Sequence, residues 1–213
     1  MISQISFLNT IQVIPVKLSI DFSKAINIRY NGYKKYGLSH EEIVDEYDNS
    51  KNATIFLASR ISNLNDGSNV PLGTLRILDA WRGPVELEKY VQDPAALNRF
   101  ERNFSEATRF AVTHCPERQA VKLALWKAFH RHCLGLQRNH MIVWVREGAR
   151  RDYERLMFSK LPGLSFKHQQ LGNKIHDIFY IELSGLEQRY RTINHPLHSP
   201  IFLEHHPLIK SFE

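Results

Sequence analysis

Apolar residues follow two patterns along this chain: short runs in which they alternate or are continuous, and longer stretches in which they lie three or four apart. Short runs are typical of strands, and the longer spacing is typical of helices. The runs predict strands over 11–20, 53–59, 73–81, 105–114, 141–145 and 176–183. The helical spacing predicts one helix between Asp21 and Gly37 and two more over 117–136 and 148–158. An acidic stretch, 39–48, is predicted as a short helix or a turn, and 84–103 is mixed.

The order of these elements predicts an α/β (α+β) fold. A strand and a helix come first, three strands follow, and the second half alternates strand and helix. One continuous mixed sheet with helices on both faces accommodates this order best. Polar turn residues at 61–71 connect the second and third strands as a long hairpin, and Pro15 keeps the first strand near an edge. We expect a single domain over 1–189 and leave the His- and Pro-rich tail, 190–213, unassigned.

Composition excludes several classes of protein. With 43% hydrophobic and 23% charged residues among 213, the chain is neither disordered nor fibrous. Its two cysteines, Cys115 and Cys133, exclude a disulfide scaffold and a zinc ribbon, and its 11 His show no metal-ligand spacing, so no metal site is expected. No run of about 18 apolar residues and no signal peptide is visible, so we expect no transmembrane segment and a cytoplasmic location.

Positive charge is concentrated in the second half of the chain. Residues 1–110 hold 13 Lys+Arg and 13 Asp+Glu, whereas residues 111–213 hold 15 against 9, which accounts for the net +6. This bias favours an acidic partner, such as nucleic acid, a phosphorylated cofactor or an acidic carrier protein, and the alternative is a solvated helix face. Because no nucleic-acid-binding motif accompanies the charge, nucleic acid is not the expected partner.

Four short motifs combine charged residues with predicted elements. They are NIRYNGY with Arg29, VDEYD with Asp45 and Asp48, GTLRI with Gly73 and Arg76, and EATRFAV with Glu106, Thr108 and Arg109. In this order they resemble the Gcn5-related N-acyltransferase (GNAT) superfamily. More specifically, they resemble the long-chain N-acyl amino acid synthases and the acyl-homoserine-lactone (autoinducer) synthases, over roughly residues 15–185. Those families carry an Arg on the first helix, a D-x-x-D-type run, a G-x-x-R strand and an E-x-[ST]-R strand.

The resemblance implies a mostly antiparallel central sheet flanked by helices on both faces. It also implies transfer of a long-chain fatty acyl group from acyl carrier protein, or from acyl-CoA, to the α-amine of an amino acid. The amine attacks the thioester directly, so acyl-phosphopantetheine or acyl-CoA is a co-substrate and no cofactor is covalently bound. Autoinducer synthases typically have a Trp after the first-helix Arg, where this chain has Tyr30, which favours the amino acid branch.

Three other functions stay open. The chain could be an autoinducer synthase that uses S-adenosylmethionine, or an acetyl-CoA-dependent acetyltransferase. The stretch THCPERQAV, 113–121, lacks the Gly-rich loop usual in acetyltransferases of this fold, which argues against the second. A non-catalytic basic binding module is the non-enzyme alternative, and charged residues inside predicted strands argue against it.

Each motif residue has a catalytic and a structural interpretation. Glu106 is the candidate base for the amine, or a carboxylate paired with Arg109 or Arg76. A guanidinium fork of Arg76 and Arg109 suits the acceptor's carboxylate, although ion pairing with Asp45, Asp48 or Glu106 is the commoner use of a single Arg. Asp45 and Asp48 are expected to hold Arg29 and shape the amine site, or to form a solvated turn. Thr108 orients a water, donates to the thioester oxygen, or simply favours the strand.

The second half supplies candidates for the donor side. Docking of an acidic carrier protein is assigned to Arg118, Lys122, Arg146, Arg150 and Arg151. Apolar bulk for the acyl chain comes from Trp126, Phe129, Met141, Val143, Trp144 and Phe158. Residues at such spacing are more often plain core.

Overall fold

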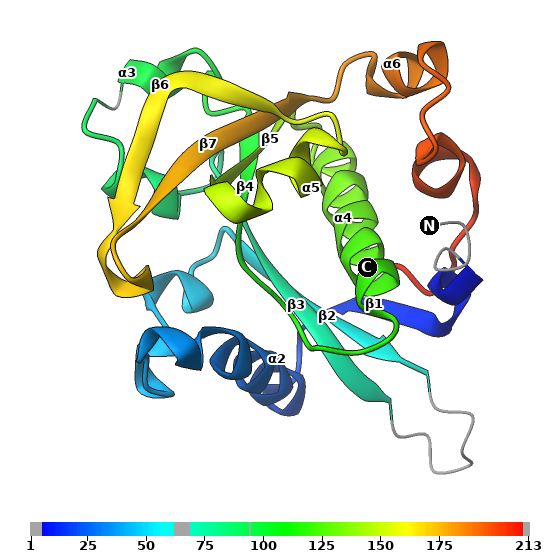
Figure 1. The fold of residues 1–213 in the computed structure, drawn as a ribbon, viewed down its shortest axis with the longest axis horizontal. Coiled ribbons are helices and arrows are strands. Elements are labelled where there is room, and N and C mark those ends of the chain that lie inside the picture. The colour runs from blue at the N-terminus through cyan, green and yellow to red at the C-terminus, as the bar shows by residue number, and fades with distance from the viewer. Residues whose placement is uncertain (1–5, 62–68, 94, 211–213) are drawn as a thin grey trace.

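The computed structural model describes residues 6–61, 69–93 and 95–210, and they form one seven-stranded sheet in the order β1-β2-β3-β4-β5-β7-β6 (Figure 1). The strands are β1 (Ile11–Pro15), β2 (Ala53–Arg60), β3 (Val70–Asp79), β4 (Phe104–Val112), β5 (His140–Arg146), β6 (Ser159–His168) and β7 (Lys174–Glu182). Only β4 and β5 pair in parallel, so the predicted mixed and mostly antiparallel sheet is confirmed. Most of the predicted turn at 61–71 lies outside the described residues.

Two long helices cover opposite faces of this sheet (Figure 1). The α-helices are α2 (Ser19–Tyr33), α3 (Ala95–Asn98), α4 (Arg118–Gly135), α5 (Arg150–Glu154) and α6 (Leu186–Thr192). Short 3-10 turns are η1 (Ser6–Thr10), η2 (Lys34–Tyr36), η3 (Glu41–Ile43), η4 (Glu46–Asn49), η5 (Glu86–Lys89), η6 (Glu147–Ala149) and η7 (Gln169–Leu171), and η8 (Ser199–Leu203) is a π-helical turn. No helix in the described ranges is long and apolar enough to cross a membrane.

Strand β2 shows how the sequence builds a two-sided core. Phe56 and Ala58 pack into the cluster that contains α4, whereas Ile55 and Leu57 pack against α2. Successive side chains of a strand point to opposite faces, so a strand covered on both faces becomes a continuous apolar run. This is why ATIFLAS was recognisable as a central strand.

A β-bulge interrupts the regular alternation of β4. Thr74 and Arg76 of β3 pair with Ala111 and Thr108, so one residue of β3 faces two of β4, and Arg109 has a φ of 52°. Strict alternation would have placed Ala111 on the same face as Ala107, but Ala107 packs with α4 and Ala111 packs with α2. Because a bulge inserts one extra residue, each side chain after it points to the face of the sheet opposite to the one that strict alternation predicts.

Strands β4 and β5 separate after a short paired stretch. Their parallel register joins 104–107 to 140–143, although β4 continues to Val112 and β5 to Arg146. The sheet therefore opens between the ends of two central strands, directly beside the bulge.

Strand β6 was missed by the sequence prediction. The helix predicted over 148–158 is confined to η6 and α5, and Ser159–His168 is an edge strand that pairs with β7. Pro162 and Gly163 read as helix-ending residues, yet they sit where the β6–β7 register shifts, between Lys160 and Ser165. An edge strand tolerates proline at such an irregularity because no ladder hydrogen bond is lost there.

Candidate functional site

The acidic run at the start of η4 is fixed by its own backbone. Asp45 Oδ1 accepts from the backbone N–H of Tyr47 at 3.0 Å, and Asp48 Oδ2 accepts from the N–H of Asp45 at 3.2 Å. This reciprocal capping starts η4 and is the consequence of the three-residue spacing of the two aspartates. It directs both remaining carboxylate oxygens toward the sheet.

Arg29 meets this run from α2. Its side chain is fully buried, and Nη1 donates to Asp48 Oδ1 at 2.7 Å. Nε and Nη2 are buried without a partner among the described residues. Burial lowers the pKa of Arg29, and Asp48 partly offsets this effect. The structure therefore joins Arg29 and Asp48 inside the protein.

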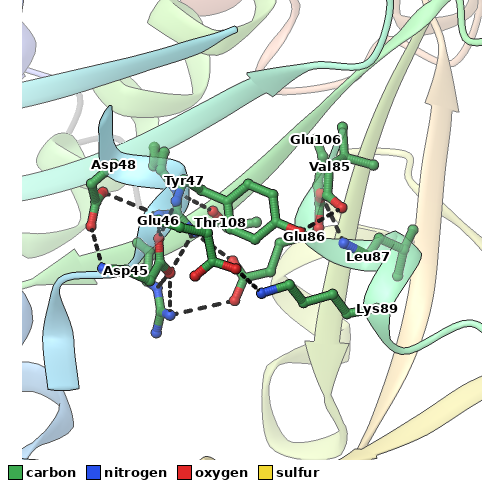
Figure 2. A network of polar contacts seen from close by, with 12 residues as sticks. Asp45, Glu46, Tyr47, Asp48, Val85, Glu86, Leu87, Lys89, Glu106 and Thr108 are labelled. Carbon is green, nitrogen blue, oxygen red and sulfur yellow. Dashed lines mark hydrogen bonds and ion pairs between the residues drawn. The ribbon is translucent and has the colours of Figure 1, made fainter. Parts of the chain in front are cut away.

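Arg76 on β3 is the centre of a buried network. Figure 2 labels its partners Asp45, Asp48, Glu86 and Thr108. Its Nε donates to Thr108 Oγ1 at 2.9 Å, and its Nη2 pairs with Glu86 Oε2 at 2.6 Å. Nη1 contacts Asp45 and lies 3.1 Å from Asp48 Oδ1. A buried guanidinium is tolerated only when such partners satisfy it. Every nitrogen of Arg76 is thus engaged by the protein.

Arg109 extends the network from the bulge. Its Nη2 lies 2.6 Å from Asp45 Oδ2 and 3.4 Å from Glu86 Oε1, and its Nε donates to the same Asp45 oxygen at 3.2 Å. Burial alone would raise the pKa of Asp45, but Arg76 and Arg109 outweigh it and hold that pKa at about 2. No protein acceptor within the described ranges engages Arg109 Nη1, which leaves it available to a ligand.

Glu106 stands apart from these ion pairs. Its Oε2 accepts from the backbone N–H of Leu87 at 3.1 Å and its Oε1 from Trp144 Nε1 at 2.8 Å, and Figure 2 shows it on the Leu87 side of the network. The predicted alternative of direct pairing with Arg76 or Arg109 is therefore wrong. Complete burial, reinforced by the charge of Glu86, raises the pKa of Glu106 to about 8. A carboxyl in this state is poised for proton transfer near neutral pH.

Glu86 is the network residue that the sequence did not reveal. It lies in η5, within the stretch read only as mixed, and it bonds both Arg76 and Arg109. Three motif arginines faced only two aspartates once Glu106 was excluded, so a further buried carboxylate was needed. Charge balance was the available signal for this carboxylate, but no motif indicated that it was Glu86.

A polar cavity of about 770 Å³ opens beside this network. Asp45, Glu86 and Arg109 form its inner wall. The remaining lining comes from the turns around η3 to η5 and from the end of β6 with η7: Glu42, Val44, Glu46, Lys89, Tyr90, Lys167, His168, Gln169 and Gln170. The β6 contribution could not be predicted because the strand itself was missed. No trio of His, Cys, Asp or Glu in the described ranges is arranged to hold a metal ion.

An aromatic cluster contacts Glu106 through Trp144. Tyr90 stacks on Phe166 with ring centroids 4.5 Å apart, and Trp144 lies 5.2 Å from His168. Trp144 was predicted among the acyl-chain residues, but the pleat of β5 turns it to the face opposite Val143, toward Glu106. Burial among these apolar groups raises the pKa of Glu106 because it disfavours the charged carboxylate.

A second, apolar cavity lies on the α4 face of the sheet. Its volume is only about 20 Å³, and Trp126, Met141 and Phe158 line it as expected of an acyl-chain site. The other lining residues are His130, Leu156, Ile181, Leu186, Tyr190, Ile201 and Phe202. Phe129 and Val143 are ordinary core residues.

The five residues assigned to donor docking divide into two groups. Lys122 pairs with Asp152 at 2.7 Å, Arg150 pairs with Asp177, and Arg146 donates to the Tyr36 hydroxyl. Arg118, at the first position of α4, and Arg151, on α5, have exposed side chains. The second group presents positive charge to an approaching partner.

Comparison with known proteins places this arrangement in a family. The family described as N-acyl amino acid synthase FeeM matches residues 24–176, which include all four motifs. The chain belongs to this family. Its predicted identity as an acyltransferase is confirmed, and it is an N-acyltransferase. No curated protein sequence matches it.

Solved structures give the same fold. FeeM, an N-acyl amino acid synthase from uncultured soil microbes, aligns with a TM-score of 0.64 at 15% identity, over 84% of this chain and 95% of FeeM. The AHL synthase LasI aligns at 0.57 and 19% identity, over 81% and 89% of the two chains. BjaI, a CoA-dependent acyl-homoserine lactone synthase, aligns with a TM-score of 0.59 at 14% identity, over 87% of this chain and 90% of BjaI. A GNAT-family acetyltransferase from Staphylococcus aureus also matches, so the predicted GNAT-like fold is confirmed.

Proposed function

We propose that this N-acyltransferase joins a long-chain fatty acyl group to the α-amine of an amino acid. The observation that carries the proposal is Glu106, a buried carboxyl with a raised pKa of about 8. It is bonded to Leu87, which follows the cavity-lining Glu86, and it lies on the stretch of β4 that pairs with β5 before the two strands separate. The amine nitrogen attacks the thioester carbonyl, the carbon–nitrogen bond forms, and the carbon–sulfur bond breaks. The amine loses a proton to the base, and the protonated base returns a proton to the leaving sulfur, which departs as a thiol.

The acceptor amino acid occupies the 770 Å³ cavity. Arg109 Nη1 has no acceptor among the residues that the structure describes, so it suits the carboxylate of the acceptor amino acid. Arg76 has no nitrogen to spare, and we assign it, with Asp45 and Asp48, to building the wall that fixes Arg109. Arg29 supports that wall through Asp48.

Glu106 serves as the base. Each carboxylate oxygen has two lone pairs, so the bonds from Leu87 and Trp144 leave one lone pair on each oxygen for an incoming proton. The amine reaches it directly or through one water. Thr108 accepts from Arg76 and keeps its own hydroxyl proton, which can orient that water.

The thioester lies where β4 and β5 separate. The residue that a bulge inserts lacks a partner across the ladder, so its backbone N–H is a candidate donor to the oxyanion of the tetrahedral intermediate. From this point the acyl chain follows the α4 face. Phe110, next to the bulge, packs against Trp126 at 6.3 Å, and Trp126 lines the apolar cavity.

The donor is acyl carrier protein. An acidic carrier protein matches the exposed guanidinium groups of Arg118 and Arg151 at one end of the opening, whereas the already paired Lys122, Arg146 and Arg150 strengthen the local positive field. Acyl-CoA, whose phosphates are also acidic, is the competing donor that the experiment distinguishes.

The test is mass spectrometry of organic extracts from bacteria that express this chain, the Glu106→Gln variant or an empty vector. N-acyl amino acids that appear only with the wild type support the proposal and name both acceptor and chain length. Purified protein supplied with acyl carrier protein or acyl-CoA then identifies the donor. Acyl lactones with release of methylthioadenosine, or transfer of acetyl groups alone, would overturn it.

A further inference from the structure

The chain after β7 closes the apolar cavity. Leu186 and Tyr190 of α6 and Ile201 and Phe202 of η8 line it, and all four lie beyond residue 176, where the family match ends. In Figure 1 α6 and the following segment, in orange and red, run beside α4. The wall opposite α4 and β5 is therefore supplied by sequence outside the shared family core.

A buried lysine holds this wall in place. Lys127 of α4 has almost no exposed surface, and its Nζ contacts the carbonyl oxygens of Pro200 and Glu204 at 2.6 and 2.7 Å and His206 Nδ1 at 2.7 Å. One turn further along the helix, Arg131 donates to the carbonyl oxygens of His206 and Ile209 at 3.2 and 2.8 Å. Two cations of one helix thus fasten the tail by its backbone.

The size of the cavity indicates which wall moves. About 20 Å³ is roughly the space of one water molecule, so a fatty acyl chain needs one wall to withdraw. Met141 and Ile181 belong to paired strands, and Trp126 belongs to the longest helix described, so their positions are fixed by regular backbone bonding. The η8 turn is attached to α4 through side-chain contacts, which can shift without breaking the sheet.

We propose that η8 is an adjustable end wall of the acyl site and that Phe202, with Ile201, sets the acyl chain length. The inference rests on the proposed function, because it requires a long-chain acyl donor. The Phe202 ring fills the space between His130 and Tyr190, each with its ring centroid 5.2 Å away. Removal of the ring lengthens the cavity along α4. For each additional methylene of the acyl chain that becomes buried, the affinity of the protein for the acyl donor improves about fourfold.

The experiment measures binding of acyl-pantetheines with 8, 12 and 16 acyl carbons by calorimetry, without any acceptor amine. These probes carry the arm common to both donors. Phe202→Ala and Ile201→Ala are expected to raise the preference for 16 over 12 carbons at least tenfold, and Phe202→Leu by less. Leu203→Ala is the matched control, because Leu203 is the next residue, is 61% exposed and does not line the cavity.

The outcomes separate the two proposals. An unchanged preference in folded Phe202→Ala and Phe202→Leu proteins, or an equal change in Leu203→Ala, would overturn the end-wall assignment. A shifted preference without any N-acyl amino acid product would keep the end wall and refute the proposed reaction. N-acyl amino acid products whose chain lengths are the same in all variants would refute the end-wall assignment and support the proposed reaction.

Discussion

The two cavities lie on opposite faces of one sheet and are built by different kinds of interaction. The polar cavity depends on directional contacts among a few charged side chains, with Arg76 at their centre. The apolar cavity depends on how rings and aliphatic side chains fill a volume, and part of its wall lies outside the family match. In the proposed reaction the first arrangement positions the acceptor, and the second limits the length of the acyl chain.

The largest expected effect concerns Glu106. Glu106→Gln keeps the shape and the buried position but cannot accept a proton, so turnover should fall about 1,000-fold. Rates of N-acyl amide formation, measured with saturating donor and acceptor, check this. Glu86→Gln is the comparison variant, since Glu86 lines the cavity but is occupied by two arginines. A near-native rate for Glu106→Gln would remove Glu106 from the mechanism.

The same variant changes how stability depends on pH. The pKa of Glu106 in the folded protein is about 8, above its ordinary value of 4.5, so its favourable contribution is complete below pH 4.5 and is lost as pH rises through 8. Between pH 5 and 9 the wild type should lose up to about 4 kcal/mol relative to Glu106→Gln. Urea unfolding at both pH values measures the difference, and parallel curves for the two proteins would contradict the assigned pKa.

Conservative substitutions test the contrast between the two faces. Lysine cannot reproduce the forked contacts of Arg76, so Arg76→Lys should destabilise the protein by about 3 kcal/mol, because buried carboxylates lose their partners. Met141→Leu in the apolar wall preserves volume and should cost less than about 1.5 kcal/mol. Denaturant unfolding of both variants checks this. Equal losses in the free energy of unfolding would mean that the polar network is no more sensitive to conservative substitution than the apolar packing.

The motifs predicted the polar face better than the apolar one for a physical reason. Two aspartates three residues apart can cap a turn, and an Arg within a buried strand needs carboxylate partners, so ion pairing of Arg76 with Asp45 or Asp48 was among the interpretations that the motifs allowed. Glu86 escaped because its turn has no periodic pattern. The orientation of Arg109 could not be predicted because a bulge leaves no signal in residue types.

The apolar face was harder to predict because volume has no spacing rule. Trp126, Met141 and Phe158 were recognised as apolar bulk, but their ordinary role as core was equally compatible with the pattern. Trp144 was grouped with them although its side chain lies on the other face of the sheet, since a fully apolar run does not reveal to which face each residue points. The η8 wall was invisible because its closure depends on Lys127, 73 residues earlier in the chain than Pro200.

A smaller effect is expected at Trp144. Its indole N–H stabilises the ionised form of Glu106, so Trp144→Phe should raise the pKa of Glu106 and move the rising limb of the pH–rate profile about one unit to higher pH. Phe166→Leu is the control, because Phe166 packs in the same aromatic cluster but has no N–H to donate to Glu106. If both variants shift the profile equally, the indole hydrogen bond is not the cause.

The smallest effect is expected at the protein surface. Arg151 is exposed and belongs to neither cavity, so Arg151→Glu should leave activity with acyl-pantetheine unchanged. With acyl carrier protein at low salt, the KM should rise up to about fivefold, and the difference should vanish at high salt because exposed charges are screened. Arg191→Glu, an exposed charge on α6, provides the matched control. A similar KM for Arg151→Glu and Arg191→Glu at low salt would exclude α5 from carrier docking and favour acyl-CoA as the donor.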